Sequence, residues 1–336
     1  GMEQSTSSFN KGIQFLQMYS IFYSDSVTLS QKTKFLSSVD STPVPYDEEY
    51  VLRVCSRGVK LASRYTPRMT PRSGELPQAE PLMLMDSSPN KRAPLPTGNT
   101  VPEVEGIIDS VSFLFGDPSA TVHYWLYKEL YDPVLKGLED TIAIAYGNVF
   151  PHAVPKVKVG KIGLIQEAGY KLRAVANPGR VFQRVLEPLG DNLFKIVHDL
   201  PWDCTFDQSK AVVPLQTDLE NKRVVYSYDL SNATDLFPWR IQRAILDFLF
   251  PDSKYPQLFE DLAKGDWEFP GVGTVSWKVG QPLGLYPSFA SFALAHGIIL
   301  QGLLNQPYHG EFYILGDDVV IIDERLAKSY HQLMLR

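Results

Sequence analysis

The chain has 336 residues, of which 44% are hydrophobic and 21% are charged, as in an ordinary globular protein. Its formal net charge of −6 argues against a uniformly basic nucleic-acid coat protein, but it is compatible with an enzyme that has one local basic channel. Two cysteines, Cys55 and Cys204, are too few for a disulfide-rich secreted scaffold. We find no signal-peptide pattern, and we expect no membrane span.

The first hundred residues carry weak structural signals. Apolar spacing predicts short helices at 11–23 and 46–62. Residues 67–102 hold eight of the 25 prolines, so neither a helix nor a central strand can persist there. This segment is either a linker or an extended strap, and its apolar run at 81–85 favours the strap. We treat residues 1–104 as an N-terminal extension and predict helices over 105–147.

Basic residues are concentrated in residues 156–184, where seven lysines and arginines accompany a single acid, Glu167. Apolar and polar residues alternate on both sides of Gly169-Tyr170, which predicts a strand, a turn and a second strand. Lys171 and Arg173 would then share one strand face. Two cations so placed suit a triphosphate or a nucleic-acid backbone, although a solvated strand face is equally compatible with the pattern.

Two aspartates flank the start of a predicted helix in VVYSYDLSNATDLFPWR. Asp229 ends a β-branched and aromatic run, which predicts a core strand, and the C-terminal end of such a strand is a common place for a ligand or metal site. Asp235 lies near the start of the following helix. The D-x5-D spacing is weak evidence by itself, since Asp235 also fits a helix cap or a surface position.

A glycine-containing turn precedes a second predicted helix, in GQPLGLYPSFASFALAHGIILQGLL. Gly280 and Gly284 flank a proline, and the helix is predicted from Ser288 onward. Such a loop offers backbone N–H groups and the positive end of a helix dipole, and Ser288 can cap the helix or donate to a ligand hydroxyl. The loop matches neither a Walker loop nor G-x-G-x-x-G, and a tight turn before a buried helix is the alternative.

An acidic turn separates two apolar strands in EFYILGDDVVIID. Gly316-Asp317 is a hairpin-turn signal, and the adjacent carboxylates of Asp317 and Asp318 repel each other unless a cation neutralises them. The strands are too apolar for an exposed edge. A magnesium site explains this arrangement, because Mg²⁺ is held by one or two carboxylates together with substrate phosphates.

The four segments, in this order, resemble a viral RNA-dependent RNA polymerase of the narnavirus, mitovirus and botourmiavirus (ourmia-like) group. The basic hairpin is similar to motif F, DLSNATD to motif A, GQPLGLYPS to motif B and ILGDDVVI to motif C. The resemblance covers about residues 156–323. It implies an α/β (α+β) right-hand polymerase, with fingers over 105–223, a palm over 224–336 and a fingers insertion in the palm at about 236–279.

The resemblance also implies a role for each matching residue. Asp229 and Asp317, supported by Asp318, would hold two Mg²⁺ ions, or Mn²⁺, for an in-line transfer. Lys171 and Arg173 would bind the triphosphate. Other positions would select the ribose 2′-OH or contact RNA: Asp235, Ser288 and Gly284 at the nucleotide, and Lys156, Lys158, Lys161 and Arg180 at the RNA. The expected partners are an RNA template and product and ribonucleoside triphosphates, in the host cytoplasm or, as in mitoviruses, the mitochondrion.

Two departures from the family pattern shape the expectation. Pro287 precedes Ser288 where family members often carry a second serine. The sequence ends at Arg336, soon after motif C, so motif D, motif E and the thumb are missing from it. We therefore expect a truncated polymerase or one half of a split enzyme that is completed by a second polypeptide.

Three other functions are weighed against this expectation. A reverse transcriptase shares the fold, but the sequence around Gly316 lacks the YxDD pattern. A catalytically silent RNA-binding half or an integrated viral remnant fits the missing motifs, although the intact carboxylates argue against decay. A hydrolytic metalloenzyme has little support, because the six histidines form no H-x3-H pair.

Overall fold

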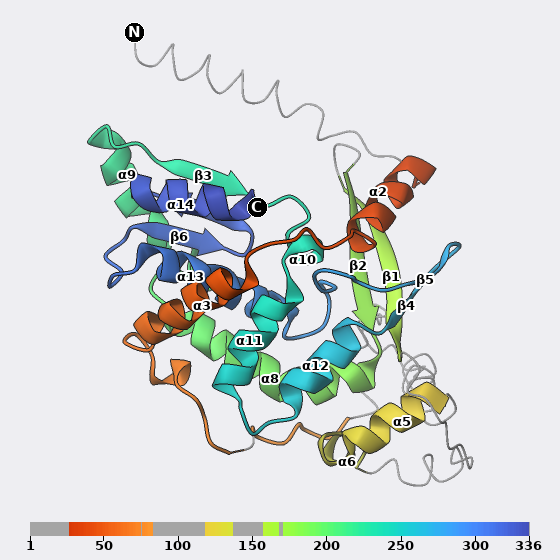
Figure 1. Cartoon of the computed structure of the whole chain (residues 1–336). Coiled ribbons are helices and arrows are strands. Elements are labelled where there is room, and N and C mark those ends of the chain that lie inside the picture. The colour runs from red at the N-terminus through yellow and green to blue at the C-terminus, as the bar shows by residue number, and fades with distance from the viewer. Residues whose placement is uncertain (1–26, 75, 83–117, 137–156, 168–170, 336) are drawn as a thin grey trace, which may run out of the picture.

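The computed structural model describes residues 27–74, 76–82, 118–136, 157–167 and 171–335. Within them, helices are mixed with strands, as expected for an α/β protein. The strands form two sheets, which Figure 1 shows on opposite sides of the molecule with a layer of helices between and below them. The predicted helix at 11–23 lies outside the described residues.

The larger sheet has the strand order β2-β1-β4-β5. Strands β1 (Lys158–Glu167) and β2 (Lys171–Pro178) pair antiparallel up to Glu167 opposite Lys171, so the predicted basic hairpin is confirmed, while its turn at 168–170 lies outside the described residues. Strand β4 (Asp266–Phe269) runs parallel to β1, and β5 (Gly273–Val275) pairs with β4. The segment at 236–279 thus contributes two strands to the sheet of the basic hairpin.

The smaller sheet has the strand order β3-β7-β6, all antiparallel. Strand β3 (Tyr226–Asp229) ends at the first aspartate, and the Gly316-Asp317 turn joins β6 (Phe312–Leu315) to β7 (Asp318–Ile321). Strands are therefore present where both were predicted, but the prediction of a core strand before Asp229 is wrong, because β3 lies at an edge of the sheet and has no fully buried residue. The outer edge of β6 is covered, because Ile314 donates its N–H to the Trp202 carbonyl and accepts from the N–H of Cys204.

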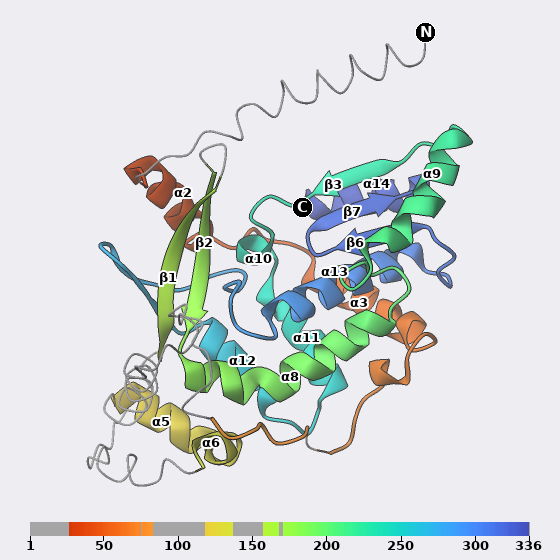
Figure 2. The same ribbon diagram turned by 180° about the vertical axis from the view of Figure 1, so that it is seen from behind.

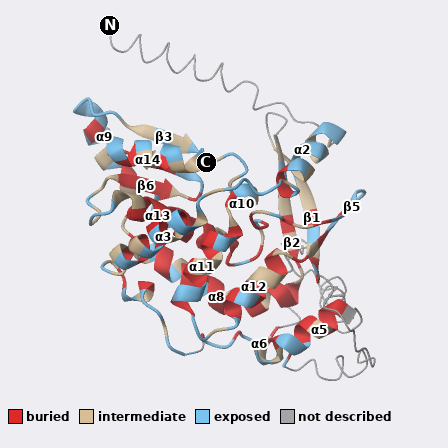
Figure 3. Cartoon of the chain, viewed as in Figure 1, coloured by how far each residue is buried: buried red, intermediate tan, exposed pale blue. Residues whose placement is uncertain are grey.

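Four helices fill the space between the sheets. They are α8 (Arg180–Asp199), α11 (Trp239–Leu249), α12 (Tyr255–Ala263) and α13 (Ser288–Leu304). Helix α13 begins at the predicted residue and is buried along most of its length (Figure 3). Helix α14 (Glu324–Met334) packs against α13 and β7. The core is therefore centred on α13. This helix is the element that precedes the acidic hairpin β6–β7 in the sequence.

Helix α3 (Glu48–Ala62) confirms the helix predicted at 46–62. It lies against α13, and two glycines permit the close approach. A Cβ atom on Gly58 would lie 2.1 Å from the carbonyl oxygen of Ile298, and one on Gly302 would lie 2.0 Å from that of Val54. Because such contacts are far shorter than van der Waals distance, only glycine fits at these two positions.

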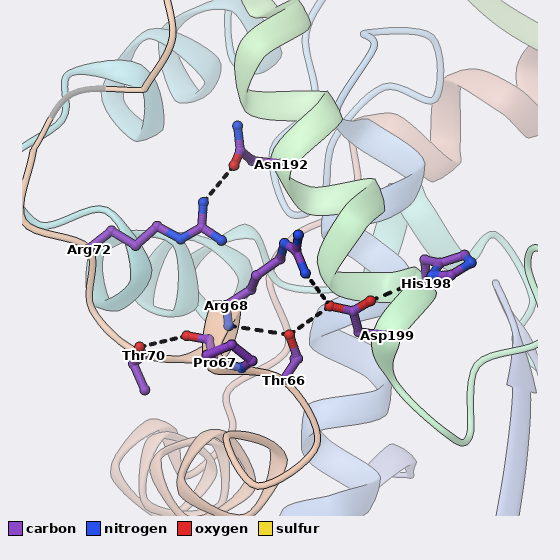
Figure 4. A network of polar contacts seen from close by, with 8 residues as sticks. All are labelled: Thr66, Pro67, Arg68, Thr70, Arg72, Asn192, His198 and Asp199. Carbon is purple, nitrogen blue, oxygen red and sulfur yellow. Dashed lines mark hydrogen bonds and ion pairs between the residues drawn. The ribbon is translucent and has the colours of Figure 1, made fainter.

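The proline-rich segment follows the surface as an extended strap over its described part, residues 67–82 without residue 75. It starts with the 3₁₀ turn η2 (Pro67–Met69). Arg68 and Thr66 both donate to Asp199 at the end of α8, each over 2.7 Å, and Arg72 donates to Asn192 over 2.6 Å (Figure 4). For the rest of the window, residues 83–102, the strap stays a prediction, because they lie outside the described residues.

The remaining described elements are shorter or peripheral. Of the helical expectation for 105–147, the described part is confirmed by α5 (Pro118–Leu126) and α6 (Lys128–Leu135), and the rest lies outside the described residues. No helix in the described ranges is long and apolar enough to cross a bilayer. The other elements are α2 (Leu29–Val39), η4 (Gln208–Ala211), α9 (Val212–Glu220) and α10 (Ala233–Leu236).

Candidate active site

Three carboxylates meet at one end of the smaller sheet. Asp229, the last residue of β3, is directly opposite Asp318, the first residue of β7, and Asp317 precedes Asp318 in the turn. Gly316 opens this turn with a φ of 62°, a conformation that glycine adopts readily. The pKa of the Asp318 carboxyl is raised, first by partial burial and then by the charges of Asp317 and Asp229.

The chemistry of this cluster fits a divalent metal ion. Within the described ranges, no three His, Cys, Asp or Glu side chains stand in a ready-made metal-binding arrangement. Mg²⁺, however, is usually bound by one or two carboxylates with substrate phosphates and waters completing its shell. The three aspartates offer only hard oxygen ligands, and their mutual repulsion is the condition that a cation would relieve. The residues present therefore suit such an ion.

A buried histidine is hydrogen-bonded to the main chain of the acidic turn. His296 of α13 is fully buried, and its Nδ1 lies 2.8 Å from the Gly316 carbonyl oxygen. Since a carbonyl only accepts, Nδ1 carries the proton, and Nε2 accepts from the Tyr330 hydroxyl of α14 at 2.9 Å. Burial lowers the pKa of His296 to about 4, so the ring is neutral at neutral pH and keeps this pattern.

Arg173 of the basic hairpin interacts electrostatically with the acidic turn. Arg173 on β2 is exposed and donates through Nε to Glu167 over 2.7 Å. The pKa of Arg173 is raised, chiefly by this hydrogen bond and charge from Glu167, with a further contribution from the charge of Asp317. The guanidinium therefore lies in the electrostatic field of the carboxylate turn, as a phosphate-binding role requires.

The other predicted cations differ in their placement. Lys158 and Lys161 on β1 are exposed, and Lys161 pairs with Glu268 over 3.3 Å. Arg180 is only 3% exposed, so in this structure it does not offer a surface contact to RNA. Lys171 is the first residue of β2, and Lys156 lies outside the described residues.

Asp235 occupies neither of the positions that its sequence context suggested as alternatives. It is inside the first turn of α10, whose N-cap is Asn232 with a φ of 53°, and it is half-buried rather than at the surface. One carboxylate oxygen accepts from the Ser38 hydroxyl over 2.7 Å, and the other accepts from the Trp277 indole over 2.6 Å. Burial raises the pKa of this carboxyl.

The glycine turn is wedged between α10 and β2. A Cβ atom on Gly280 would lie 1.9 Å from the Thr234 carbonyl oxygen, and one on Gly284 would lie 1.8 Å from the Ala176 carbonyl oxygen. Gln183 of α8 braces the same turn, because its amide donates to the Gly284 carbonyl over 2.7 Å and accepts from the Tyr286 N–H over 2.8 Å. The turn therefore joins the segment of Asp235 to the strand of Arg173.

Ser288 has a different role from either of those predicted from the sequence. It is the first residue of α13, after Pro287 at the N-cap, and no side-chain cap is formed. Its hydroxyl is fully buried and donates to the Pro282 carbonyl over 2.9 Å. In this conformation Ser288 holds the glycine turn closed and does not present its hydroxyl to a ligand.

The residues that support the site were missed by the sequence analysis. Ser38 lies far from Asp235 in the sequence, Gln183 is one polar position on a long amphipathic helix, and His296 is one of six isolated histidines. None of them belongs to a motif or a periodic pattern. The polar positions inside the otherwise apolar run 292–304, His296 and Gln301, were the one available signal.

Comparisons with known proteins bear on this arrangement. A family model described as mitovirus RNA-dependent RNA polymerase matches residues 82–336. Over 181 residues the chain is 34% identical to the RNA-directed RNA polymerase of Cryphonectria parasitica mitovirus 1, covering 52% of this chain and 22% of that protein. Two uncharacterized mitochondrial proteins of Arabidopsis thaliana are 33% and 32% identical over 40% and 41% of this chain and 70% and 59% of their own lengths.

Among solved structures, the Sicinivirus 3Dpol RNA-dependent RNA polymerase aligns with a TM-score of 0.47 and 14% sequence identity. The alignment covers 87% of this chain and 62% of that polymerase. The chain thus spans less than a quarter of the mitoviral polymerase it matches and over half of each plant protein.

Proposed function

Because the chain belongs to the mitovirus RNA-dependent RNA polymerase family, we propose that it carries the fingers and palm of a right-hand polymerase that copies RNA from ribonucleoside triphosphates. The observation that supports this most directly is the pairing of Asp229 with Asp318, next to Asp317, in the field of Arg173. Acidic oxygens and a phosphate-binding cation are the two components that nucleotidyl transfer requires.

In this proposal, the primer 3′-hydroxyl oxygen attacks the α-phosphorus of the incoming nucleotide. The hydroxyl loses its proton, a new phosphodiester bond forms, and the bond to the β-phosphate breaks to release pyrophosphate. Asp229 and Asp317 would hold Mg²⁺, or Mn²⁺, with Asp318 in support, and the bound ions would supply charge stabilisation to the attacking and leaving oxygens.

The remaining residues divide between the phosphates and the sugar. Arg173 exchanges its Glu167 partner for the triphosphate, next to Lys171, and guanidinium geometry suits phosphate oxygens. Asp235 has lone pairs left after its two hydrogen bonds, so it can accept from a ribose 2′-OH. Ser288 and Gly284 contribute to the same pocket through the shape of the glycine turn. Lys158 and Lys161 face the RNA.

The mitovirus family and the two mitochondrial plant relatives support the host mitochondrion as the place of action. The host cytoplasm stays a prediction from the sequence.

The test is primer extension on a short RNA template with Mg²⁺ and ribonucleotides, comparing the chain with Asp229→Asn. We expect the substitution to lower incorporation by at least about 10²-fold, since it removes a charged metal ligand. Asp252→Asn is the matched control, because Asp252 is an exposed aspartate in the turn after α11. It should leave incorporation unchanged.

Two results would contradict the proposal. Incorporation that persists in Asp229→Asn would remove this carboxylate from the site. No incorporation by the unsubstituted chain, with RNA binding retained, would favour the catalytically silent RNA-binding half, and adding the C-terminal part of a mitoviral polymerase would then show whether activity is rescued.

A further inference from the structure

Helix α3 and the start of the strap carry a basic stripe that has no role in the proposed reaction. Residues 50–74 contain six cations and no acidic residue, in a chain whose net charge is −6. We define the basic stripe as Arg53, Arg57, Lys60 and Arg64, extended along the strap by Arg68 and Arg72.

Three cations of the stripe, Arg53, Arg57 and Lys60, share one face of the helix, and Arg64 follows in the turn after it. Their spacing of four and three residues places the three within an arc of about 60° at 100° per residue. The opposite face carries the buried residues, among them Val51, Val54 and Val59, which pack towards α13. This face therefore lies opposite the buried face, along about 10 Å of helix from Arg53 to Lys60.

Most of this charge is not cancelled by neighbouring acids. Lys60 and Arg64 are exposed and form no ion pair with any described residue. Arg57 donates to the Gly302 carbonyl over 2.7 Å, which uses one N–H but does not neutralise the charge. Arg53 pairs with Glu49, where both side chains are more than half exposed, and such surface pairs are weak.

The strap continues the positive surface. Arg68 is paired with Asp199, but Arg72 is hydrogen-bonded to a neutral amide, Asn192 (Figure 4). The pKa of Arg72 is lowered, first by burial and then by the charge of Arg68, so positive charge accumulates at this end. Figures 1 and 2 show α13 beside α3, and α13 contacts the carboxylate turn through His296. The stripe lies on the face of α3 opposite its buried residues, so it is a separate surface from that turn.

We propose that the basic stripe binds the sugar-phosphate backbone of RNA, without reading sequence, at a site apart from the carboxylate turn. A row of six cations, of which two, Arg53 and Arg68, are paired with acids, is the electrostatic pattern of a backbone-binding surface. Its length along α3, about 10 Å, corresponds to about three phosphates at 3.4 Å per residue of one strand. An anionic membrane is the less favourable partner, because the apolar face of α3 is buried against α13 and cannot insert between lipids.

The test measures binding of a short labelled RNA by fluorescence anisotropy over a range of salt concentrations. The stripe variant is Arg57→Gln/Lys60→Gln/Arg64→Gln. Its matched control is Lys136→Gln/Arg325→Gln/Lys328→Gln, three exposed cations on α14 and after α6. Both variants change the net charge from −6 to −6 − 3 = −9, so they separate the position of the charge from its amount.

We expect the stripe variant to bind RNA at least about tenfold more weakly at physiological salt, with a log-log salt slope smaller by about 2. The control variant should stay within about twofold of the unsubstituted chain. Because Arg57 also contacts α13, the double variant Lys60→Gln/Arg64→Gln, which keeps the Gly302 contact, should show the same trend with an unchanged thermal unfolding midpoint.

Three results would overturn the proposal: equal losses in the stripe and control variants, no RNA binding by the unsubstituted chain, or loss of binding to vesicles of an anionic phospholipid with RNA binding unchanged. The binding measurement does not depend on catalysis. If the unsubstituted chain incorporates no nucleotide while the stripe variant binds RNA more weakly than the control variant, the polymerase proposal is contradicted and this proposal is supported.

Discussion

At the scale of single residues, the orientation of the acidic turn depends on one buried side chain of α13. His296 fixes the Gly316 carbonyl through Nδ1 and is itself fixed by the Tyr330 hydroxyl. Both partners are buried, so a lost hydrogen bond is not replaced by water. His296 is therefore a positioning residue for Asp317, the neighbour of Gly316.

We predict that His296→Leu lowers the free energy of unfolding by about 2–3 kcal/mol, because it leaves a buried carbonyl without a donor, and also lowers nucleotide incorporation per folded molecule. His296→Asn keeps an amide N–H close to the position of Nδ1 and should recover part of both. Urea unfolding and primer extension measure the two effects. Equal behaviour of the Leu and Asn variants would show that the ring contributes only volume.

At the scale of secondary-structure elements, local patterns identified the parts of the site but not how they are held. The basic hairpin, the strand ending at Asp229 and the helix starting at Ser288 follow from alternation, helical spacing and turn signals. The contact of Ser38 with Asp235 joins segments 197 residues apart, and β4 pairs with β1 from more than 90 residues away. Such pairings depend on tertiary packing, which no local pattern encodes.

The α3–α13 crossing gives a prediction at this scale. Gly58→Ala should destabilise the protein by about 1–3 kcal/mol, although alanine is the better helix former by about 1 kcal/mol, because the new methyl group would meet the Ile298 carbonyl. Ser56→Ala on the exposed side of the same helix should be neutral or slightly stabilising. Denaturant unfolding measures the free energy of unfolding of both variants. A higher value for Gly58→Ala than for the unsubstituted chain would contradict the prediction, because it would mean that α3 and α13 can move apart without a loss of stability.

At the scale of the whole molecule, the charge distribution was only partly predicted. The sequence analysis located the positive charge at 156–184 and missed the stripe on α3, where apolar residues separate the cations so that only a helical projection reveals them. The resemblance to mitoviral polymerases is confirmed by the family match. The boundaries between N-terminal extension, fingers and palm stay predictions, as do the roles of the individual site residues.

Buried histidines make the stability of the whole fold sensitive to acid. Burial lowers the pKa of His123 to about 4, against 6.5 in the unfolded chain, so below pH 6.5 the unfolded state binds a proton that the folded state does not. The free energy of unfolding should therefore fall by about 2 kcal/mol between pH 7 and pH 5 on account of this residue. In His123→Phe, the free energy of unfolding should fall by about 2 kcal/mol less over this pH range than in the unsubstituted chain. Urea unfolding of both proteins at pH 7 and pH 5 measures the difference. The same pH dependence in both proteins would contradict the assignment.

The glycine turn sets the spacing between two segments that the sequence places far apart. Gly280 rests against the main chain of α10, and Gly284 rests against the main chain of β2, so the turn spaces the segment of Asp235 from the strand of Arg173. Because these contacts are with main-chain atoms, rotamer changes nearby do not relieve them. One added methyl group at either glycine would push the two segments apart, and a nucleotide held as proposed by Asp235 and Arg173 would then reach only one of them at a time.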